Sequence, residues 1–334
     1  MSRRTVAAAV LCLAAGPARA YVRSTTPSGH CLWWSARQVH YAVNDFTVDP
    51  AASVCSSSPA GSVFTSVDAS FATWGATGCS DLQLVSDGHT ASSATGLDCQ
   101  NLVVFRRGLC TDLVPAGDPC RLWEVNGGAT VNCADKYNCW DTADPSHGDS
   151  RVIALTTVSY VDDTGEIVDA DMELNAWNGG GPSPPGYYFT CVGATSESLV
   201  ALAACGPGGP APPDCRCAAP GQSGCISMDV QNVVTHEAGH VLGLGHSSDP
   251  TATMYASAPL GETAKRTLAA DDANGLCSIY PTGASTRVTC DGSGLLAPRP
   301  PSACEQPSSS CGCGTAGAEG WLGLLALLLW RRRR

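Results

Sequence analysis

Positive charge is scarce in this sequence. The 334 residues include 19 Lys and Arg against 30 Asp and Glu, so the formal net charge is −11, and charged residues of both signs make up only 15%. No run of more than two basic residues occurs outside the C-terminal four arginines. A protein that binds nucleic acid needs a basic face toward the phosphates. We therefore expect no nucleic-acid partner.

Paired Cys-x-x-Cys motifs, which are typical of zinc ribbons, are missing although the chain holds 19 cysteines. In a reducing compartment so many thiols would suggest metal clusters. The spacings found here fit disulfide bonds in an exported protein better. The cysteine content therefore indicates an oxidising compartment and a fold stapled by disulfides.

The N-terminus has the form of an export signal. Two arginines precede an apolar run over residues 6–15, and Ala18-Arg19-Ala20 has the small-x-small pattern of a signal-peptidase site. The run is too short to span a bilayer. We expect cleavage after Ala20, which makes residues 1–20 a signal peptide. The protein is then secreted or held at the cell surface.

Hydrophobic periodicity predicts several strands and helices. Alternation of apolar and polar residues is typical of strands, whereas apolar residues three and four apart are typical of helices. An aromatic stripe that ends at Phe71 and Trp74 predicts a helix over 61–76, with these rings in the core. Asp229 is the expected N-cap of a later helix. The remaining predicted elements are strands at 38–44, 82–85, 102–106, 151–161 and 166–175, and a last helix at 268–280.

Two segments, about 108–150 and 176–226, are irregular and rich in cysteine, and we interpret them as disulfide-stapled insertions. After residue 281 the composition changes to Pro, Ser and Gly, which predicts an exposed stalk over 282–310. The final segment, 311–334, contains Cys311-Gly312-Cys313-Gly314, an apolar run of marginal length for a membrane span, and four terminal arginines.

The stretch His236-Glu237-Ala238-Gly239-His240-Val241-Leu242-Gly243-Leu244-Gly245-His246 has the form His-Glu-x-x-His-x-x-Gly-x-x-His. Residues four apart on a helix project from one face, so His236 and His240 can bind one metal ion. Gly243 can take a positive φ, which would end the helix and turn His246 back toward the ion. Three neutral imidazoles leave zinc a position for water, as a catalytic site requires. Glu237 then serves as the general base.

With this motif the sequence resembles the matrixins, a family of metzincin metallopeptidases. Met254 stands where the Met-turn methionine of that family lies beneath the metal. The resemblance also rests on His246-Ser247-Ser248-Asp249-Pro250, Asp271-Asp272 and Ile279-Tyr280-Pro281. It implies an α+β metzincin-type zincin domain over 21–281, interrupted by the two insertions. Its core would be a mixed, twisted five-stranded sheet with an active-site helix and a C-terminal helix.

The resemblance implies a zinc metalloendopeptidase with one catalytic zinc ion, an activated water and a protein or peptide substrate. The substrate would lie extended beside the edge strand that includes Ile153, Ala154 and Leu155, and would add backbone hydrogen bonds as an extra strand. Tyr255 is a candidate pocket wall or transition-state donor, or a packing residue. We expect a monomer.

Further metal sites are less favoured. His147-Gly148-Asp149 stands where matrixins bind a structural zinc, but Leu155 and Ile167 occupy the places of its other two histidines, so we expect no second zinc. A group of acidic residues could bind Ca²⁺ through oxygen ligands, or it could form a solvated hairpin face. Its members are Asp162, Asp163, Asp169, Asp171 and Glu173.

Two other functions stay open on the sequence: a non-catalytic adhesion or structural module on the same fold, and a zinc hydrolase that acts on cell-wall peptide cross-links. The C-terminal segment resembles the sorting signal of myxobacterial surface proteins. That resemblance implies processing near Cys311 and Cys313, with membrane contact only through the tail and the arginines on the cytoplasmic side.

Overall fold

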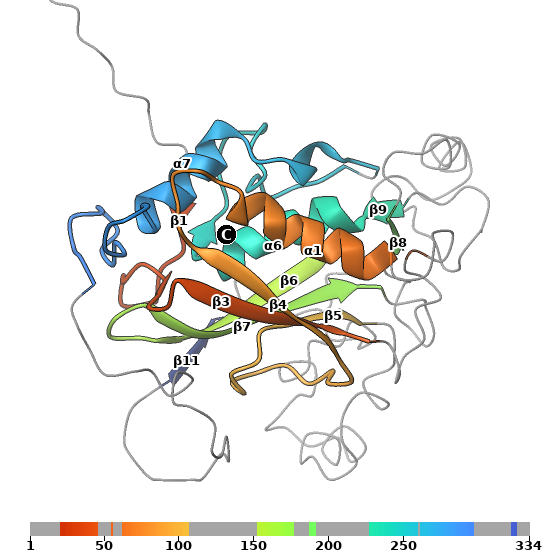
Figure 1. Cartoon of the computed structure of the whole chain (residues 1–334), viewed down its shortest axis with the longest axis horizontal. Helices are drawn as coiled ribbons and strands as arrows, with labels where there is room; N and C mark the ends of the chain where they lie inside the picture. Colours follow the sequence, from red (N-terminus) through yellow and green to blue (C-terminus); the bar gives the residue numbers. More distant parts are fainter. Residues whose placement is uncertain are drawn as a thin grey trace, which may run out of the picture.

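The computed structural model describes residues 21–45, 55, 62–106, 152–176, 187–191, 227–259, 261–296 and 322–325. The expected signal peptide, the first insertion with His147-Gly148-Asp149, and most of the second insertion and tail lie outside these residues. The described residues form an α+β domain in which helices cover one face of a mixed sheet (Figure 1). Within them, no helix has the length and apolar character that a bilayer crossing requires.

Five long strands form the sheet in the order β6-β7-β5-β3-β4. Strands β7, β5, β3 and β4 run parallel, and β6 runs antiparallel to β7 as its hairpin partner. The expectation of a mixed five-stranded sheet is therefore confirmed, with two short strands added at β7 and β6. The bounds are β3 Gln38–Asn44, β4 Gln83–Thr90, β5 Leu102–Arg106, β6 Ala154–Val161, β7 Glu166–Asn175, and for the additions β2 Trp33–Trp34 and β11 Leu322–Leu325.

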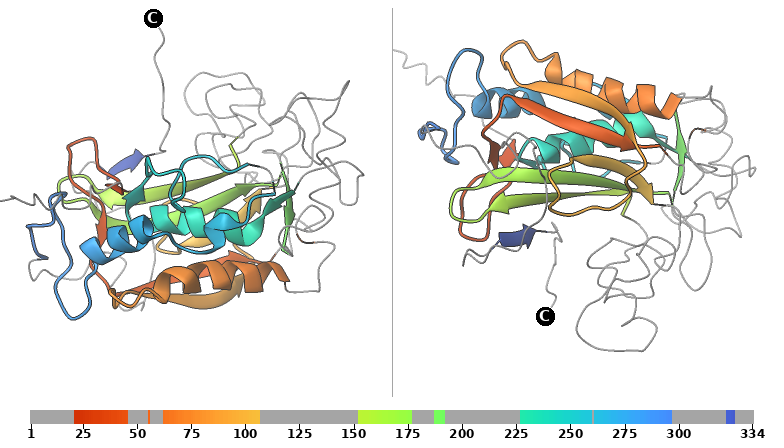
Figure 2. Two further views of the ribbon diagram at one scale, coloured as in Figure 1. Left: turned by 90° about the horizontal axis from the view of Figure 1, so that it is seen from above. Right: turned by 60° about the horizontal axis from the view of Figure 1, so that its bottom comes forward.

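Helices α1 (Ser62–Gly75) and α6 (Val230–Val241) lie side by side on one face of the sheet (Figure 2). The aromatic stripe of α1 is core packing as predicted, because Phe71 and Trp74 are buried. The Trp74 indole nitrogen donates to the backbone oxygen of Thr235 on α6 at 2.8 Å. A Cβ on Gly239 would collide with Met254 Sδ and lie 2.8 Å from the Trp74 ring. This close approach fixes the position of α6 on the sheet.

Helix α7 (Ala270–Ile279) closes the domain over the C-terminal end of α6. Tyr280, directly after α7, is fully buried. Its hydroxyl donates to the backbone oxygen of Leu242 at 3.0 Å and accepts from the backbone nitrogen of Trp34 at 3.0 Å. One side chain therefore joins the last helix, the turn after α6 and the N-terminal part of the chain.

Residues 282–296, the first part of the expected exposed stalk, are attached to the domain. They are mostly exposed, but Cys290 forms a disulfide with Cys31, and the Arg23 guanidinium donates to the backbone oxygen of Thr289 at 2.7 Å. Arg287 donates its backbone N–H to Ile279. These contacts join 282–296 to the domain. The composition of the segment indicates its exposure but does not reveal a long-range disulfide.

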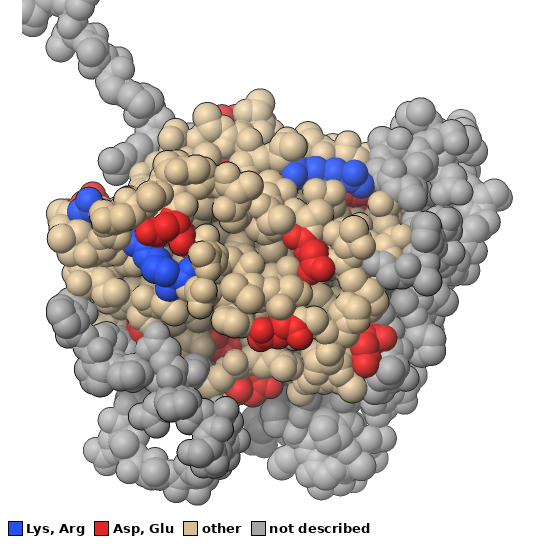
Figure 3. All heavy atoms as spheres, in the orientation of Figure 1, with Lys and Arg blue, Asp and Glu red and all other residues tan. Residues whose placement is uncertain are grey.

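The acidic residues of β7 also differ from the expected solvated face. Asp169, Asp171 and Glu173 are buried, at 1%, 2% and 0% exposure, on the sheet face opposite the helices. Backbone N–H groups of the 91–101 loop and the side chain of Arg106 cover them. Asp169, Asp171 and Glu173 stand at every second position of a strand and so share one face, but the sequence pattern does not reveal the loop that buries that face. By contrast, the exterior face in Figure 3 shows separate acidic side chains and few basic ones.

Short strands and disulfides complete the domain. Strand β1 (Val22–Arg23) pairs with β10 (Leu244–Gly245), and β8 (Tyr188–Thr190) pairs with β9 (Ser227–Asp229) directly before α6. Besides Cys31–Cys290, disulfides join Cys55 to Cys191 and Cys79 to Cys277. The disulfide framework predicted from the cysteine content is thus present in the described part of the chain.

Candidate metal centre

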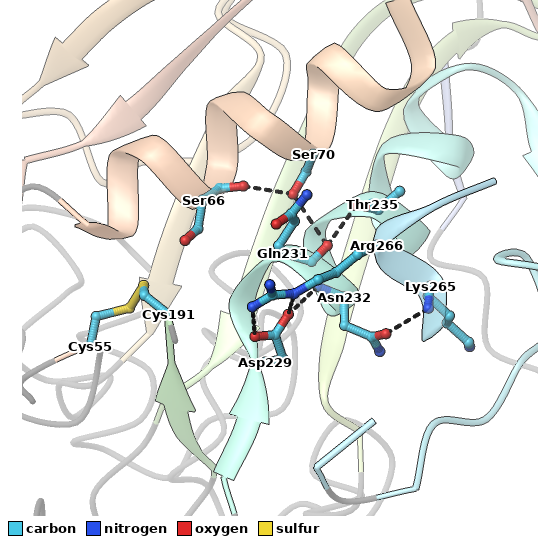
Figure 4. Close-up of polar contacts among 10 residues, drawn as sticks. All are labelled: Cys55, Ser66, Ser70, Cys191, Asp229, Gln231, Asn232, Thr235, Lys265 and Arg266. Carbon is cyan, nitrogen blue, oxygen red and sulfur yellow. Dashed lines mark hydrogen bonds and ion pairs between the residues drawn. A yellow bond between two sulfur atoms is a disulfide. The ribbon is translucent and has the colours of Figure 1, made fainter. Parts of the chain in front are cut away.

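The N-terminus of α6 is held by polar contacts (Figure 4). Asp229 is the N-cap, as predicted, and its Oδ1 accepts from the backbone nitrogen of Asn232 at 2.8 Å. The Arg266 guanidinium forms an ion pair with the same carboxylate. The side-chain oxygen of Asn232 accepts from the backbone nitrogen of Lys265 at 2.8 Å. The 3₁₀ turn η1 (Ala264–Arg266) is thereby fastened to the start of the helix that carries the histidines.

His236 and His240 project from the same face of α6, and the chain turns directly after it. Gly243 has φ +88°, as its position in the motif predicts, and a Cβ there would lie 2.7 Å from the backbone oxygen of Leu32. Only glycine fits this turn without strain. The turn brings His246 back, and the ligand atoms of the three histidines all lie within 4.8 Å of one another.

The tautomers of two histidines are set by carbonyl groups. His236 Nδ1 lies 2.6 Å from the backbone oxygen of Thr253, and His240 Nδ1 lies 2.8 Å from that of Leu244. A carbonyl oxygen can only accept, so each Nδ1 carries the proton and each Nε2 keeps a free lone pair. Such a second partner orients a metal-binding imidazole.

The spacing of the nitrogens fits a zinc ion. His240 Nε2 lies 3.2 Å from His246 Nε2, so the two nitrogens can reach one cation placed between them. Two nitrogens bound to one tetrahedral zinc at about 2.0–2.1 Å lie about 3.3 Å apart. Burial lowers the pKa of His240 and of His246 to about 4, and lowers the pKa of His236 well below its usual value. All three imidazoles are therefore neutral near pH 7 and able to bind metal.

Glu237 is buried next to the triad, with 6% of its surface exposed. Its Oε2 accepts from Thr156 Oγ1 at 2.6 Å. Burial raises the pKa of Glu237 to about 7, although the Thr156 hydroxyl and the Lys265 ammonium both oppose that rise. A carboxyl group with a pKa near neutrality can both accept and release a proton at physiological pH, as a general base and acid must.

Met254 and Asp272 form the floor of the site. Met254 is 1% exposed and packs against Gly239 of α6. The Asp272 carboxylate accepts from the backbone nitrogens of Thr253 and Met254, at 2.8 and 3.0 Å. Since Thr253 in turn accepts from His236, Asp272 supports the first ligand through the backbone of this turn.

The predicted substrate-binding residues lie on two separate segments. Ile153, Ala154 and Leu155 are half-buried at the start of β6, the edge strand of the five. Tyr255 follows the floor of the site and is also half-buried. Its backbone oxygen accepts from the buried ammonium of Lys265, which also donates to Ser257 at 3.1 Å.

Sequence reasoning missed three residues of the site: Thr156, Lys265 and the supporting role of Asp272. Thr156 and Lys265 lie far from the motif along the chain, and no spacing rule connects them to it. Asp272 was noted only as part of a family resemblance. Its distance of three residues from Ala269, whose backbone nitrogen it also accepts from, is a capping signal that could have placed it.

Comparison with known proteins agrees with this geometry. Residues 156–281 match the family model described as Matrixin. The chain is 46% identical to human neutrophil collagenase over 67 residues, which cover 18% of this chain and 14% of that protein. It is 27% identical to human matrilysin over 160 residues, or 41% of this chain and 60% of that protein.

It is also 50% identical to metalloendoproteinase 1 of Glycine max over 54 residues, or 16% of this chain and 17% of that protein. The chain thus spans less than two thirds of the length of these curated relatives. The match to the family model takes in all three histidines, Glu237 and Met254 but begins after Leu155. These similarities support a matrixin-like metallopeptidase domain.

Proposed function

We propose, starting from a matrixin-like metallopeptidase domain, that this protein is an exported endopeptidase that hydrolyses peptide bonds with one zinc ion and Glu237. The observation that carries the proposal is the joint placement of three neutral imidazoles and one buried carboxylate. His236, His240 and His246 offer their ligand atoms within 4.8 Å of one another, and Glu237 follows the first of them on the same helix.

In the proposed hydrolysis the histidines bind the metal ion and Glu237 transfers the proton. His236, His240 and His246 would hold the zinc ion, which would supply polarisation of the scissile carbonyl and a more acidic water. Glu237 accepts a proton as the water oxygen bonds to the carbonyl carbon, and it returns a proton to the amine nitrogen as the C–N bond breaks. His236 and His240 stay fixed through their Nδ1–H bonds to backbone carbonyls. No covalent intermediate with the chain is needed.

For substrate binding we propose the edge of β6 near Ile153, Ala154 and Leu155, where no strand other than β7 in the described part of the chain pairs with it. An extended peptide would pair there as an added strand, which favours peptides and proteins as substrates. Thr156, the next residue, contacts Glu237, so this end of β6 is adjacent to the carboxylate. The segment from Tyr255 to Ser257, held by Lys265, is the proposed wall of the pocket beyond the scissile bond.

Export through the signal peptide and processing of the tail near Cys311 are part of the same proposal. The three disulfides between described residues support an oxidising compartment. Recovery of mature protein that begins at Tyr21 and lacks the terminal arginines would agree with it. Intact protein that still carries both ends outside the cell would contradict it.

The test compares wild type with Glu237→Ala and His240→Ala on a mixed protein substrate. We expect Glu237→Ala to keep one zinc per chain and to lose about 10²–10⁴-fold in kcat/KM, the usual contribution of a general base. We expect His240→Ala to lose the zinc itself. Removal of zinc by a chelator should abolish cleavage, and added zinc should restore it. His40→Ala, at an exposed histidine on β3, is the matched control. Equal cleavage by wild type and Glu237→Ala would refute the mechanism.

A further inference from the structure

Thr156 lies on the core face of β6, directly against α6, the helix that carries His236 and His240. Its partner across the hairpin is Met172, a core residue, and opposite residues of an antiparallel pair share a face. Only 3% of Thr156 is exposed. Its neighbour Thr157 pairs with Asp171 and therefore faces the buried carboxylates on the other side of the sheet. Thr156 thus brings a buried hydroxyl group to the contact between β6 and Glu237 of α6.

The Thr156 hydroxyl has two acceptors within reach, and both belong to Glu237. Oγ1 lies 2.6 Å from Oε2 of the carboxylate and 3.3 Å from the backbone oxygen of the same residue. A hydroxyl has one proton, and a bond to a buried carboxylate is shorter and about twice as strong as one to a neutral carbonyl. The proton therefore goes to Oε2. In the described part of the chain, Oε1 accepts no hydrogen bond.

We propose that Thr156 is a positioning residue for the general base: it holds Oε2 so that Oε1 alone faces the reacting water. This inference rests on the proposed function of Glu237. Two equivalent oxygens would let the carboxylate rotate between orientations, only some of which reach the water. With Oε2 held, the proton from the water arrives at Oε1 and leaves from Oε1 to the amine nitrogen, while Thr156 keeps its own proton throughout.

The variants Thr156→Val and Thr156→Ser separate positioning from packing. Valine keeps the shape of threonine and removes the hydroxyl, whereas serine keeps the hydroxyl and removes a methyl group. A charge-assisted hydrogen bond of about 1.5–3 kcal/mol corresponds to a loss of about 10- to 100-fold in kcat for Thr156→Val. We expect KM and the zinc content to stay at the wild-type values, and Thr156→Ser to recover most of the lost kcat. Thr157→Val, on the same strand but the opposite face, should leave kcat unchanged.

A double variant tests whether the effect passes through Glu237. In a Glu237→Ala background, Thr156→Val should change the residual rate no further, because residues that act as one unit are not additive. The inference is overturned if Thr156→Val keeps full kcat, if serine does not rescue it, if zinc is lost instead, or if the two substitutions multiply. If wild type and Glu237→Ala cleave equally, the proposed function fails first. An active wild type beside an equally active Thr156→Val refutes the positioning role alone.

Discussion

Gly243 and Gly29 share a backbone angle but differ in their surroundings. Their φ values are +88° and +87°. A Cβ at Gly243 would lie 2.7 Å from the backbone oxygen of Leu32, whereas a Cβ at Gly29 would meet nothing within 4 Å. Alanine at Gly29 would therefore add backbone strain alone. Alanine at Gly243 would add the same strain and a steric clash at the turn before His246.

We predict that Gly243→Ala lowers both the free energy of unfolding and the zinc affinity. Left-handed backbone costs a non-glycine residue about 1–2 kcal/mol, and the clash adds to that cost at Gly243 only. Gly29→Ala should show the strain alone, with normal zinc affinity. Urea unfolding and competition with a chelator measure the two quantities. Identical values for both variants would mean that Leu32 moves away without cost.

A second prediction at the residue scale concerns Asp272. This side chain is 1% exposed and accepts backbone N–H groups of Thr253, Met254 and Ala269. Asp272→Ala leaves these buried donors unpaired, at about 1–3 kcal/mol for each unsatisfied group. We expect a lower unfolding midpoint in urea and weaker zinc binding, since Thr253 no longer holds His236. The exposed Asp163→Ala is the control, and wild-type zinc affinity in Asp272→Ala would argue against support through the turn.

At the scale of the element, β7 separates two environments. Its residues alternate between core side chains, such as Met172, and buried carboxylates, such as Asp171. Asp171 accepts from the backbone nitrogens of Gly96 and Leu102, at 2.6 and 3.0 Å, so the carboxylate anchors the loop between β4 and β5. One face of β7 thus packs toward α6, and the other face holds the loop between β4 and β5.

The β7 carboxylates predict a pH dependence of stability. Burial raises the pKa of Asp169 to about 6 and that of Asp171 to about 8, and each lies well above the ordinary value of 3.8. Between about pH 4 and each raised pKa, the folded chain therefore binds more protons than the unfolded chain. Stability from this source is complete below about pH 4 and is lost as the pH rises through 6 and then 8, by at most about 1.4 kcal/mol per pH unit for each proton.

We expect the urea midpoint of wild type to fall between pH 5 and pH 9, and the midpoint of Asp171→Asn to fall less steeply. Asparagine cannot ionise, although it replaces one acceptor with a donor and so lowers the midpoint at every pH. The slope, not the absolute midpoint, is the measured quantity. Asp163→Asn, at an exposed site, should keep the wild-type slope. Parallel curves for wild type and Asp171→Asn would contradict the assignment.

At the scale of the whole molecule, two disulfides close long loops. Cys31–Cys290 joins residues 259 apart and Cys79–Cys277 joins residues 198 apart. A native disulfide typically contributes about 2–5 kcal/mol, mainly by restricting the unfolded chain. We predict that Cys31→Ser with Cys290→Ser lowers the unfolding midpoint under oxidising conditions by that amount. Under full reduction the variant and wild type should converge, and a difference that persists there would point to lost packing instead.

The sequence predicted the elements whose signals are local. Strand β3 and strand β5 have the predicted bounds, because alternation and apolar runs report burial directly. The zinc triad was also predictable, since its chemistry requires fixed intervals along one helix and a glycine at the turn. Even the N-cap Asp229 was found, because capping depends on neighbours three residues away.

The features that the sequence could not predict depend on residues distant in the chain. The contact of Thr156 with Glu237 spans 81 positions. This contact depends on the register of β6 against β7 and on the position of α6 over the sheet. No local sequence pattern predicts either of them. The attachment of 282–296 depends on which thiols pair, and the burial of Asp169 depends on a loop folded across it. Local patterns therefore predict the histidine triad, and tertiary packing determines how the Glu237 carboxylate beside it is oriented.

The pairing of β1 with β10 joins two segments that are synthesised at different times. Ser24 donates its side-chain hydroxyl to the backbone oxygen of Leu244, 220 positions later, and its backbone N–H to Gly243. The turn before His246 is braced by these contacts and by the Arg23 bond to Leu32. Because Leu244 lies 220 positions after Ser24, these contacts can form only once the chain has been synthesised to that point. A chain that ends before Gly243 therefore lacks the contacts that hold the turn before His246.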